Sequence, residues 1–453
     1  MSYPGKTAFI KLAHLWMAQH PVAHAAAWSI LGMMWTRVCA LVISLITARF
    51  VDQSEFGSYG YILNTVTMFS VAGSLGMSVT AAHFIARYEK RHHDRAKLIA
   101  TSCAIVALVS GLISAAVMCA IMLNRQFSGQ NFEIDNTLFA ISSTVVVLAS
   151  INGSLAGGLT GFKKFREIAG ANLKTSLLHP PLAIILVSLY GLEGAILGIA
   201  VGPTILMLFL RASLKPHTAS VRETIFRQGA LGRYLQVVRY GATNAVSGLI
   251  TNFAHWHVLT LLVAGKGGLA AMAIYTIALQ WRSAIMFVPG TFSQVLLPFF
   301  SEFNPKSGIF STLEKKSLIA TVILAIAVSI PAAILSRPIL SLYGQDYVDG
   351  VLVLIVVCLT AIPISFSNAI GQVILARGKV LLAFIGNCLW AFSLVMFSNE
   401  FLEVDPEAMS LAGATAISYI FLSIILFAFA LFIGSKRANR MQRPTASTID
   451  GPQ

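Results

Sequence analysis

Apolar runs of roughly 20 residues or more recur along the whole chain, and they constrain the fold more than any other feature. A helix of that length crosses the hydrocarbon core of a bilayer, which is about 30 Å thick. Of the 453 residues, 56% are hydrophobic and 11% are charged, whereas a soluble domain carries about 25% charged residues. A soluble fold could not bury so much apolar surface. The sequence therefore predicts an all-α polytopic membrane protein and excludes the soluble, secreted and disordered classes.

Twelve apolar runs are long enough to be transmembrane helices. They lie at 25–48, 57–81, 98–123, 137–160, 169–190, 192–210, 241–263, 268–300, 317–336, 349–375, 380–398 and 409–433. The longest connection, 211–240, is strongly basic and divides them into two sets of six. We therefore expect a cytoplasmic N-terminal segment (1–24), an N-terminal lobe (25–210), a basic cytoplasmic linker (211–240), a C-terminal lobe (241–433) and a disordered cytoplasmic tail (434–453).

Positively charged residues are distributed unevenly between alternate connections. With the N-terminus placed in the cytoplasm, 25 of the 32 Lys and Arg residues fall on the cytoplasmic side and four on the opposite side. Lys and Arg in short loops set the orientation of a membrane protein. Both termini are therefore predicted to be cytoplasmic. The same asymmetry explains the net charge of +14 without a nucleic-acid partner.

The two sets of six spans resemble each other weakly. Asn152 precedes Lys163 by eleven residues in NGSLAGGLTGFKK, and Asn368 precedes Lys379 by the same interval in NAIGQVILARGK. Each stretch leads from the fourth span of its set into the fifth. Transporters with parallel repeats place their binding site between the two halves. We therefore predict two pseudo-symmetric six-helix lobes around a central cavity.

Three basic residues, Arg37, Lys174 and Arg282, fall inside the predicted spans, whereas every acidic residue is assigned to a connection or a span end. A charge near the middle of the bilayer is costly, so it usually faces a cavity and has a partner. With no carboxylate available inside the spans, the natural partner is an anion that does not belong to the protein.

The depth of each cation leaves two interpretations open. Arg37 lies twelve residues from Arg49, about 18 Å along a helix, and it either faces a polar cavity or bonds to helix carbonyls. Arg282 lies near the middle of the eighth span, whose two polar sides indicate a border with both a cavity and a neighbouring helix. Lys174 lies about 12 Å past Arg166, so its long stem could reach the inner surface instead of binding a substrate.

Polar residues form stripes at helical spacing in the seventh and eighth spans. The seventh carries Asn244, Ser247, Thr251 and His255, and the eighth carries Thr276, Gln280 and Ser283. His255 is a candidate for proton coupling, because histidine exchanges a proton near neutral pH; the alternative is a hydrogen-bonded packing residue. The substrate-binding candidates are Arg37, Lys174, Asn244, Thr251, His255, Gln280 and Arg282.

Signatures of enzyme chemistry are missing from the sequence. No Gly-rich phosphate loop opens a helix, and no connection on the outer side is long enough for a catalytic domain. The cysteines lie in apolar runs without metal-ligand spacing, and His257 points away from His255, so the two cannot bind one metal ion from one helix face. We expect no catalytic residues, no cofactor and no metal site.

Several longer stretches follow one another in a distinctive order. The first half contains ARFVDQSEFGSYGYI, GSLGMSVTAAHFIARY, GLTGFKKFREIAGANL and GLEGAILGIAVG. The second half contains YTIALQWRSAIMFVPGTFSQVLLPFFSE and LYGQDYVDGVLVLIVVCLTAIPISFSNAIGQVILARGK. In order and spacing, these stretches resemble the polysaccharide-biosynthesis exporters of the multidrug/oligosaccharidyl-lipid/polysaccharide (MOP) superfamily. The resemblance covers nearly the whole chain.

The resemblance implies a flippase that moves undecaprenyl-diphosphate-linked oligosaccharides across the bacterial inner membrane for O-antigen, capsule or exopolysaccharide synthesis. It also implies two six-helix lobes in a MATE-like arrangement around a central cavity, with a lateral opening for the lipid tail. Related lipid II flippases carry essential arginines in the first and eighth spans, where Arg37 and Arg282 lie in this chain. An aspartate follows the first-span arginine in those flippases, whereas Val38 follows Arg37 here.

Residues and resemblance together predict that Arg37 and Arg282 hold the diphosphate while polar stripes bind sugar hydroxyls. The expected partners are the lipid-linked oligosaccharide, the bilayer, and the polysaccharide polymerase and glycosyltransferases of the pathway; the chain itself is expected to be a monomer. The driving force stays open between the membrane potential, a proton on His255 and an ion bound by carbonyls. The alternative function is a cation-coupled multidrug exporter, which would require a carboxylate in the cavity.

Overall fold

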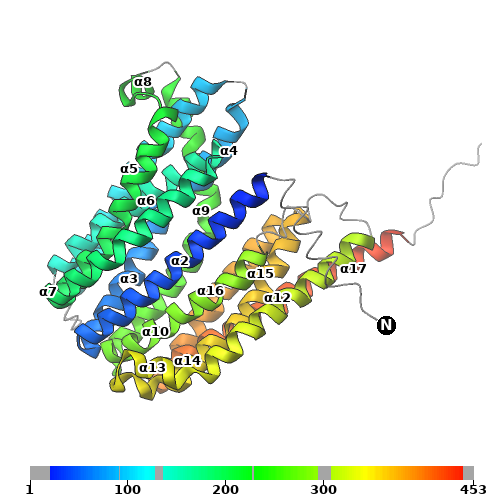
Figure 1. Ribbon diagram of the computed structural model, residues 1–453. Helices are drawn as coiled ribbons and strands as arrows, with labels where there is room; N and C mark the ends of the chain where they lie inside the picture. Colours follow the sequence, from blue (N-terminus) through cyan, green and yellow to red (C-terminus); the bar gives the residue numbers. More distant parts are fainter. Residues whose placement is uncertain (1–20, 91, 128–135, 227–228, 294–307, 442–453) are drawn as a thin grey trace, which may run out of the picture.

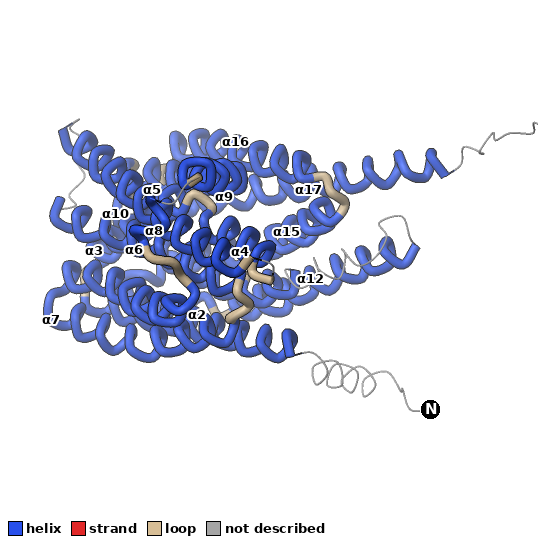
Figure 2. Tube along the Cα trace, turned by 90° about the horizontal axis from the view of Figure 1, so that it is seen from above, coloured by secondary structure: helices blue, strands red, loops and turns tan. Residues whose placement is uncertain are grey.

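A computed structural model describes residues 21–90, 92–127, 136–226, 229–293 and 308–441 of the chain. Within these ranges every regular element is a helix, as Figure 2 shows. The all-α membrane fold expected from the apolar runs is therefore confirmed.

The first half of the chain forms one bundle of long helices. It contains α2 (Pro21–Phe50), α3 (Gln53–Ser74), α4 (Met77–Tyr88), α5 (His93–Phe127), α6 (Asn136–Gly161) and α7 (Phe165–Leu214). Leu75 and Gly76 take left-handed backbone conformations and join α3 to α4. Gly191 (φ 54°, ψ −127°) interrupts α7, so this one element carries the expected fifth and sixth spans on its two sides. Helix α6 packs between α5 and α7, and α2 packs along α7.

The second half forms another bundle after a short connection. The connection holds η1 (Lys215–His217) and α8 (Val221–Phe226). The bundle holds α9 (Ala230–Ala264), α10 (Gly268–Ile285), α12 (Gly308–Ile334), α13 (Ser336–Tyr343), η2 (Gln345–Gly350), α14 (Val351–Leu359), α15 (Ala361–Ala376), α16 (Val380–Val404) and α17 (Ala408–Met441). Helix α16 packs against both α9 and α17, and α12 packs against α15.

The helix count is compatible with twelve spans. Among the described residues, nine helices are long and apolar enough to cross a membrane, or ten when the bent pair Gly268–Ile285 and Phe287–Ser293 is one span. One of the nine is α7 with its neighbouring turn, which holds two of the expected spans, and α2 covers the first expected span.

Two helices extend beyond the ranges that hydropathy indicates. Helix α9 begins at Ala230, eleven residues before the expected seventh span, so much of the expected linker is helical. Helix α17 continues to Met441, past the start of the expected tail. Apolar runs mark only the part of a helix that lies in lipid, because a helix entering water keeps its backbone hydrogen bonds but exchanges apolar for polar side chains.

The two bundles diverge like the arms of a V (Figure 1). They meet near α10 and α13, which we call the Arg49 end, and they separate toward the end that holds α4, α8 and the start of α9, which we call the Arg239 end. At the Arg49 end, Arg49 donates hydrogen bonds to the carbonyls of Leu342 (2.7 Å) and Ser341 (3.1 Å) in the other bundle. Gln53 donates to the Asp346 carbonyl at 3.2 Å. This end is therefore held closed by direct contacts.

Close helix crossing near the Arg49 end depends on glycine. A Cβ atom on Gly57 of α3 would lie 1.9 Å from the carbonyl oxygen of Leu269 in α10, and one on Gly60 would lie 1.9 Å from Oγ1 of Thr276. No real contact is that short, so a side chain at either position would push α3 and α10 apart. The absence of side chains at Gly57 and Gly60 therefore lets α3 approach α10 closely.

We predict that Gly57→Ala destabilises the protein by about 1–3 kcal/mol, the usual cost of overpacking a close contact. The control is Gly170→Ala in α7, where an added Cβ meets no atom within 4 Å and the helix gains propensity. The thermal unfolding midpoint of the purified protein measures both variants. Equal midpoints would contradict the close crossing of α3 and α10.

Candidate functional site

A cavity of about 690 Å³ lies between the first bundle and α10. Its wall is formed by residues of α2, α3, α6, α7 and α10. Along α3 it extends from Tyr59 to Ser74, which corresponds to about 22 Å of helix. Its polar wall residues are Arg37, Asn64, Thr67, Ser70, Ser74, His179, Thr276, Gln280 and Ser283. The cavity therefore has the size of a small-ligand site and presents one arginine together with hydroxyl and amide groups.

Arg37 of α2 is the one charged side chain in this wall among the described residues. Its side chain is exposed to the cavity, and Nη1 donates a hydrogen bond to Oγ of Ser283 at 3.1 Å. A guanidinium has five N–H donors, and Arg37 forms no ion pair within the part of the chain that the structure describes. Most of its donors therefore face a cavity wall that contains no carboxylate.

The polar stripe of α10 forms the opposite wall. Thr276, Gln280 and Ser283 all line the cavity, as expected for residues that recur at a spacing of three or four on a helix. Oε1 of Gln280 is buried without a hydrogen-bond partner among the described residues. An unsatisfied buried acceptor is costly, so Gln280 is suited to accept a hydrogen bond from a ligand hydroxyl.

Arg282 points away from this cavity and into the second bundle. Arg282 follows Gln280 by two residues, which corresponds to a rotation of about 200° around the helix axis. The two side chains therefore lie on different sides of α10, and Arg282 does not line the cavity. Its guanidinium lies within electrostatic range of His255 in α9, Cys358 in α14 and Tyr419 in α17. Nη1 is buried and has no hydrogen-bond partner in the described chain. The structure therefore places Arg282 beside His255 and not beside Arg37.

The other predicted site residues lie apart from the cavity. The ammonium of Lys174 lies 5.2 Å from the ring centre of Phe209, and its side chain is exposed. Thr251 donates to the carbonyls of Ser247 (3.2 Å) and Gly248 (3.1 Å) in its own helix. Asn244 lines a different cavity at the Arg239 end. Of the seven sequence candidates, Arg37 and Gln280 are thus the pair that the structure brings together in this wall.

Sequence reasoning missed the polar face of α3. Asn64, Thr67, Ser70 and Ser74 recur at spacings of three, three and four and line the cavity. The same helical spacing that drew attention to the eighth span would have revealed them. His179 of α7 also lines the cavity, and its Nε2 lies 3.0 Å from the Gly198 carbonyl oxygen.

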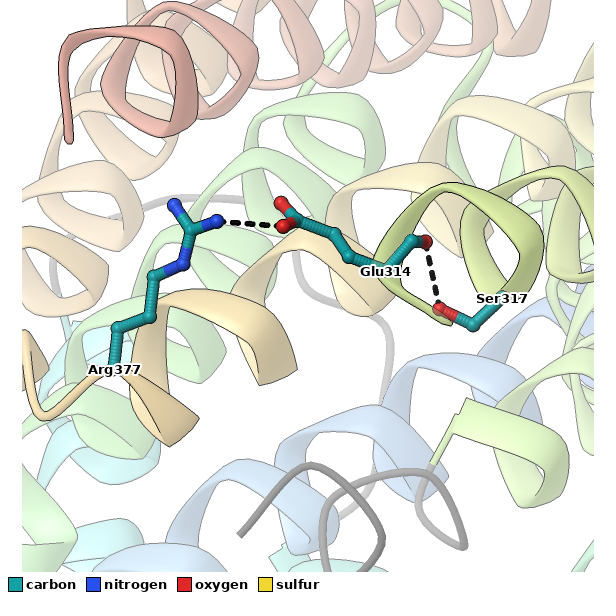
Figure 3. A network of polar contacts seen from close by, with 3 residues as sticks. All are labelled: Glu314, Ser317 and Arg377. Carbon is teal, nitrogen blue, oxygen red and sulfur yellow. Dashed lines mark hydrogen bonds and ion pairs between the residues drawn. The ribbon is translucent and has the colours of Figure 1, made fainter. Parts of the chain in front are cut away.

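Arg377 differs from Arg37 because it has an acidic partner, Glu314 (Figure 3). It follows α15, and its Nη2 lies 2.5 Å from Oε2 of Glu314 in α12. Both side chains are largely buried, with 10% and 13% exposure. This ion pair joins two helices of the second bundle, so Arg377 has a structural role, in contrast to Arg37. Within the described chain, no group of three or more His, Cys, Asp or Glu side chains could hold a metal ion.

We predict that cysteine labelling distinguishes the two sides of α10. In a variant without the five native cysteines, Ser283→Cys should react with a water-soluble maleimide because Ser283 lines the cavity. Ala278→Cys should stay unlabelled because Ala278 is fully buried. Equal labelling of the two variants in the purified, folded protein would contradict the position of the cavity.

Known structures share this architecture. The chain is similar to the lipid II flippase MurJ in an inward closed conformation, with a TM-score of 0.70, 15% identity, and coverage of 88% of this chain and 86% of that one. It is also similar to an inward-facing MATE-family multidrug resistance transporter of the MOP superfamily, with a TM-score of 0.67, 15% identity, and coverage of 91% and 96%. These likenesses establish the MATE- and MurJ-like fold.

Sequence comparison finds relatives named for polysaccharide export. The EPS I polysaccharide export inner membrane protein EpsE of Ralstonia solanacearum is 22% identical over 281 residues, which cover 60% of this chain and 62% of that protein. Its counterpart in Ralstonia nicotianae is 22% identical over 284 residues, with the same coverage. The match thus spans less than two thirds of these relatives. The polysaccharide biosynthesis protein family model matches residues 22–304, more than half of the chain. The chain therefore belongs to the polysaccharide biosynthesis protein family.

Proposed function

We propose that the protein is a flippase that translocates undecaprenyl-diphosphate-linked oligosaccharides across the bacterial inner membrane for the synthesis of a surface polysaccharide. The family, the export function named in the Ralstonia relatives and the fold shared with a lipid II flippase support this proposal. The observation that carries it is the charge of the cavity: Arg37 has no acidic partner among the described residues, and the wall around it offers hydroxyl and amide groups.

The chemistry of the wall fits a diphosphate that carries sugars. A diphosphate bears about two negative charges, and an arginine donates paired, charge-assisted hydrogen bonds to phosphate oxygens. Asn64 and Thr67 on one side and Gln280 on the other are placed to exchange hydrogen bonds with sugar hydroxyls. The polyprenyl chain stays in the surrounding lipid, where its burial costs nothing. Arg37 is therefore the proposed diphosphate ligand.

Arg282 is proposed to act on the same anion through its electric field. It lies behind α10, on the side of the second bundle, and forms no ion pair within the described chain. Charges interact over longer distances in an apolar interior than in water. A second positive charge behind the wall would favour a dianion over a neutral lipid. Lys174, Asn244 and Thr251 have no proposed contact with a diphosphate held at Arg37.

The charge distribution suggests which end faces the cytoplasm. Basic connections gather at the Arg239 end, and the positive-inside rule assigns such an end to the cytoplasm. The Arg49 end, where the bundles touch, would then face the periplasm. In this arrangement the cavity receives substrate from the inner leaflet. Release to the outer leaflet requires the hydrogen bonds of Arg49 and Gln53 to break while the bundles rock to the opposite arrangement.

The membrane potential is the proposed driving force. Moving one charge through 100 mV corresponds to about 2.3 kcal/mol, and the cytoplasm is negative. Export of a dianion is therefore driven outward by the potential, without a bound cation. A cation-coupled multidrug exporter, the alternative function, is disfavoured because no carboxylate lines the cavity in the described chain.

We predict that Arg37→Ala lowers translocation about ten- to hundredfold, the equivalent of one or two charge-assisted hydrogen bonds. Arg37→Lys should retain part of the activity, because it keeps the charge but loses the paired donors. Lys174→Ala is the control, since Lys174 lies outside the cavity wall. Uptake of undecaprenyl-diphosphate-linked oligosaccharide into inverted vesicles, with equal protein levels, measures all three. Near-normal transport by Arg37→Ala would refute the proposed function.

The driving force is tested by varying potential and pH separately. Dissipating the potential of vesicles or cells with valinomycin and potassium should slow translocation at constant pH, because the dianion then loses its electrical driving force. His255→Ala should keep the pH dependence of the wild type. Insensitivity to the potential, together with loss of pH dependence in His255→Ala, would instead establish proton coupling through His255.

A further inference from the structure

A second cavity of about 710 Å³ lies at the Arg239 end, between α4 of the first bundle and α9 of the second. It is lined by His83, Phe84, Arg87, Leu235, Gln236, Arg239, Tyr240, Thr243 and Asn244. Two arginines and a histidine contribute to its wall, and no carboxylate does. Its volume falls in the range of small-molecule sites, and its charge favours an anion.

The two arginines of this wall are not engaged by the protein. Within the described chain, neither Arg87 nor Arg239 forms a side-chain hydrogen bond or an ion pair. Arg87 has its guanidinium carbon 5.9 Å from the ring centre of Tyr88, a contact that leaves its N–H groups free. Both guanidinium groups can therefore donate to a ligand.

A neighbouring arginine provides the internal comparison. Arg233 lines an adjacent cavity that shares Gln236 with this one. Its Nε donates to Oγ of Ser102 at 2.9 Å, and its Nη2 donates to the Thr224 carbonyl. Arg233 thus ties α9 to α5 and α8, which is a structural role. Arg87 and Arg239 differ from Arg233 in that their guanidinium groups form no hydrogen bond with the described chain and lie in the wall of the cavity.

Aromatic rings form one side of the cavity. His83 stacks on Tyr240 with ring centres 4.9 Å apart and planes inclined by 17°. Phe84 meets Tyr240 edge-on at 5.1 Å. The stacked pair joins α4 to α9, and its rings form an aromatic part of the cavity wall. A flat ring surface beside a cationic pair suits a sugar attached to a phosphate group.

We propose that this cavity is a loading site that binds the lipid-anchored diphosphate of the substrate before it reaches Arg37. The inference rests on the proposed function and adds a second anion site to it. Arg87 lies thirteen residues beyond Ser74, where the first cavity ends, a separation of about 20 Å along the helix path. The loading site is thus near the membrane surface, where a diphosphate headgroup of the inner leaflet resides.

Occupation of the loading site would also influence the conformation of the transporter. A diphosphate held by Arg87 of α4 and Arg239 of α9 bridges two helices that belong to different bundles. A ligand stabilises the state to which it binds more tightly. The bound headgroup would therefore favour the arrangement of α4 and α9 that this structure shows.

The test counts bound lipids by native mass spectrometry of the purified full-length chain mixed with undecaprenyl diphosphate. The wild type should bind two molecules, and the double variant R87Q/R239Q and Arg37→Ala should each bind one. Arg211→Gln is the matched control: it removes an exposed arginine at the same end that lies outside the loading site, and it should bind two. Phosphatidylglycerol and undecaprenyl monophosphate distinguish a diphosphate site from a general phospholipid site.

Transport measurements on the same variants distinguish a failure of the loading site from a failure of the proposed function. R87Q/R239Q should raise the mole fraction of substrate that gives half-maximal uptake at least tenfold while keeping the maximal rate, whereas Arg37→Ala should lower the maximal rate. Two bound lipids in R87Q/R239Q, or equal binding of phosphatidylglycerol, would overturn the loading site and leave the role of Arg37 intact. Normal transport by Arg37→Ala would refute the proposed function without affecting the lipid count at the loading site.

Discussion

The cost of a charge without a partner in an apolar interior governs this structure. A buried ion is tolerated where another charge or a set of hydrogen bonds compensates it. Arg377 meets that condition through Glu314, and Arg49 meets it through carbonyls of the opposite bundle. Arg37 has one hydroxyl partner, and Arg282 has a buried nitrogen with none among the described residues. Arg37 and Arg282 have no acidic partner in the described chain and lie on either side of α10, where the proposed anionic ligand would complete the balance.

The fold places this charge beside the packing of α3 against α9 and α10, which joins the two bundles through a shared apolar core. Gly57 and Gly60 allow α3 to contact α10. At the same end, Arg49 donates a hydrogen bond to the Leu342 carbonyl of the other bundle. In the proposed mechanism the same cavity opens alternately toward each leaflet, which moves a polar headgroup through lipid while its tail remains outside.

Most of the architecture follows from the sequence, because apolar runs and helical spacing are local properties. The all-helical membrane fold, a number of helices compatible with twelve spans, and the polar stripe of Gln280 and Ser283 were accessible in this way. Sequence reasoning did not predict that the Arg282 side chain points away from the cavity. The two-residue offset from Gln280 already places the two side chains on different sides of the helix. The stripe of α3 was visible in principle at Asn64 and Thr67. The loading site joins α4 to α9, residues far apart in the chain, and packing alone brings them together.

The central claim is that the guanidinium of Arg37 holds the diphosphate of a lipid-linked substrate between the bundles. The most direct measurement is a cryo-EM structure of the protein in nanodiscs with undecaprenyl-diphosphate-linked oligosaccharide. We expect diphosphate density within hydrogen-bond distance of Arg37, with sugar density along α3 and Gln280 and the polyprenyl chain in the bilayer. A diphosphate bound away from Arg37, with that guanidinium turned toward lipid or bonded to helix carbonyls, would contradict the account.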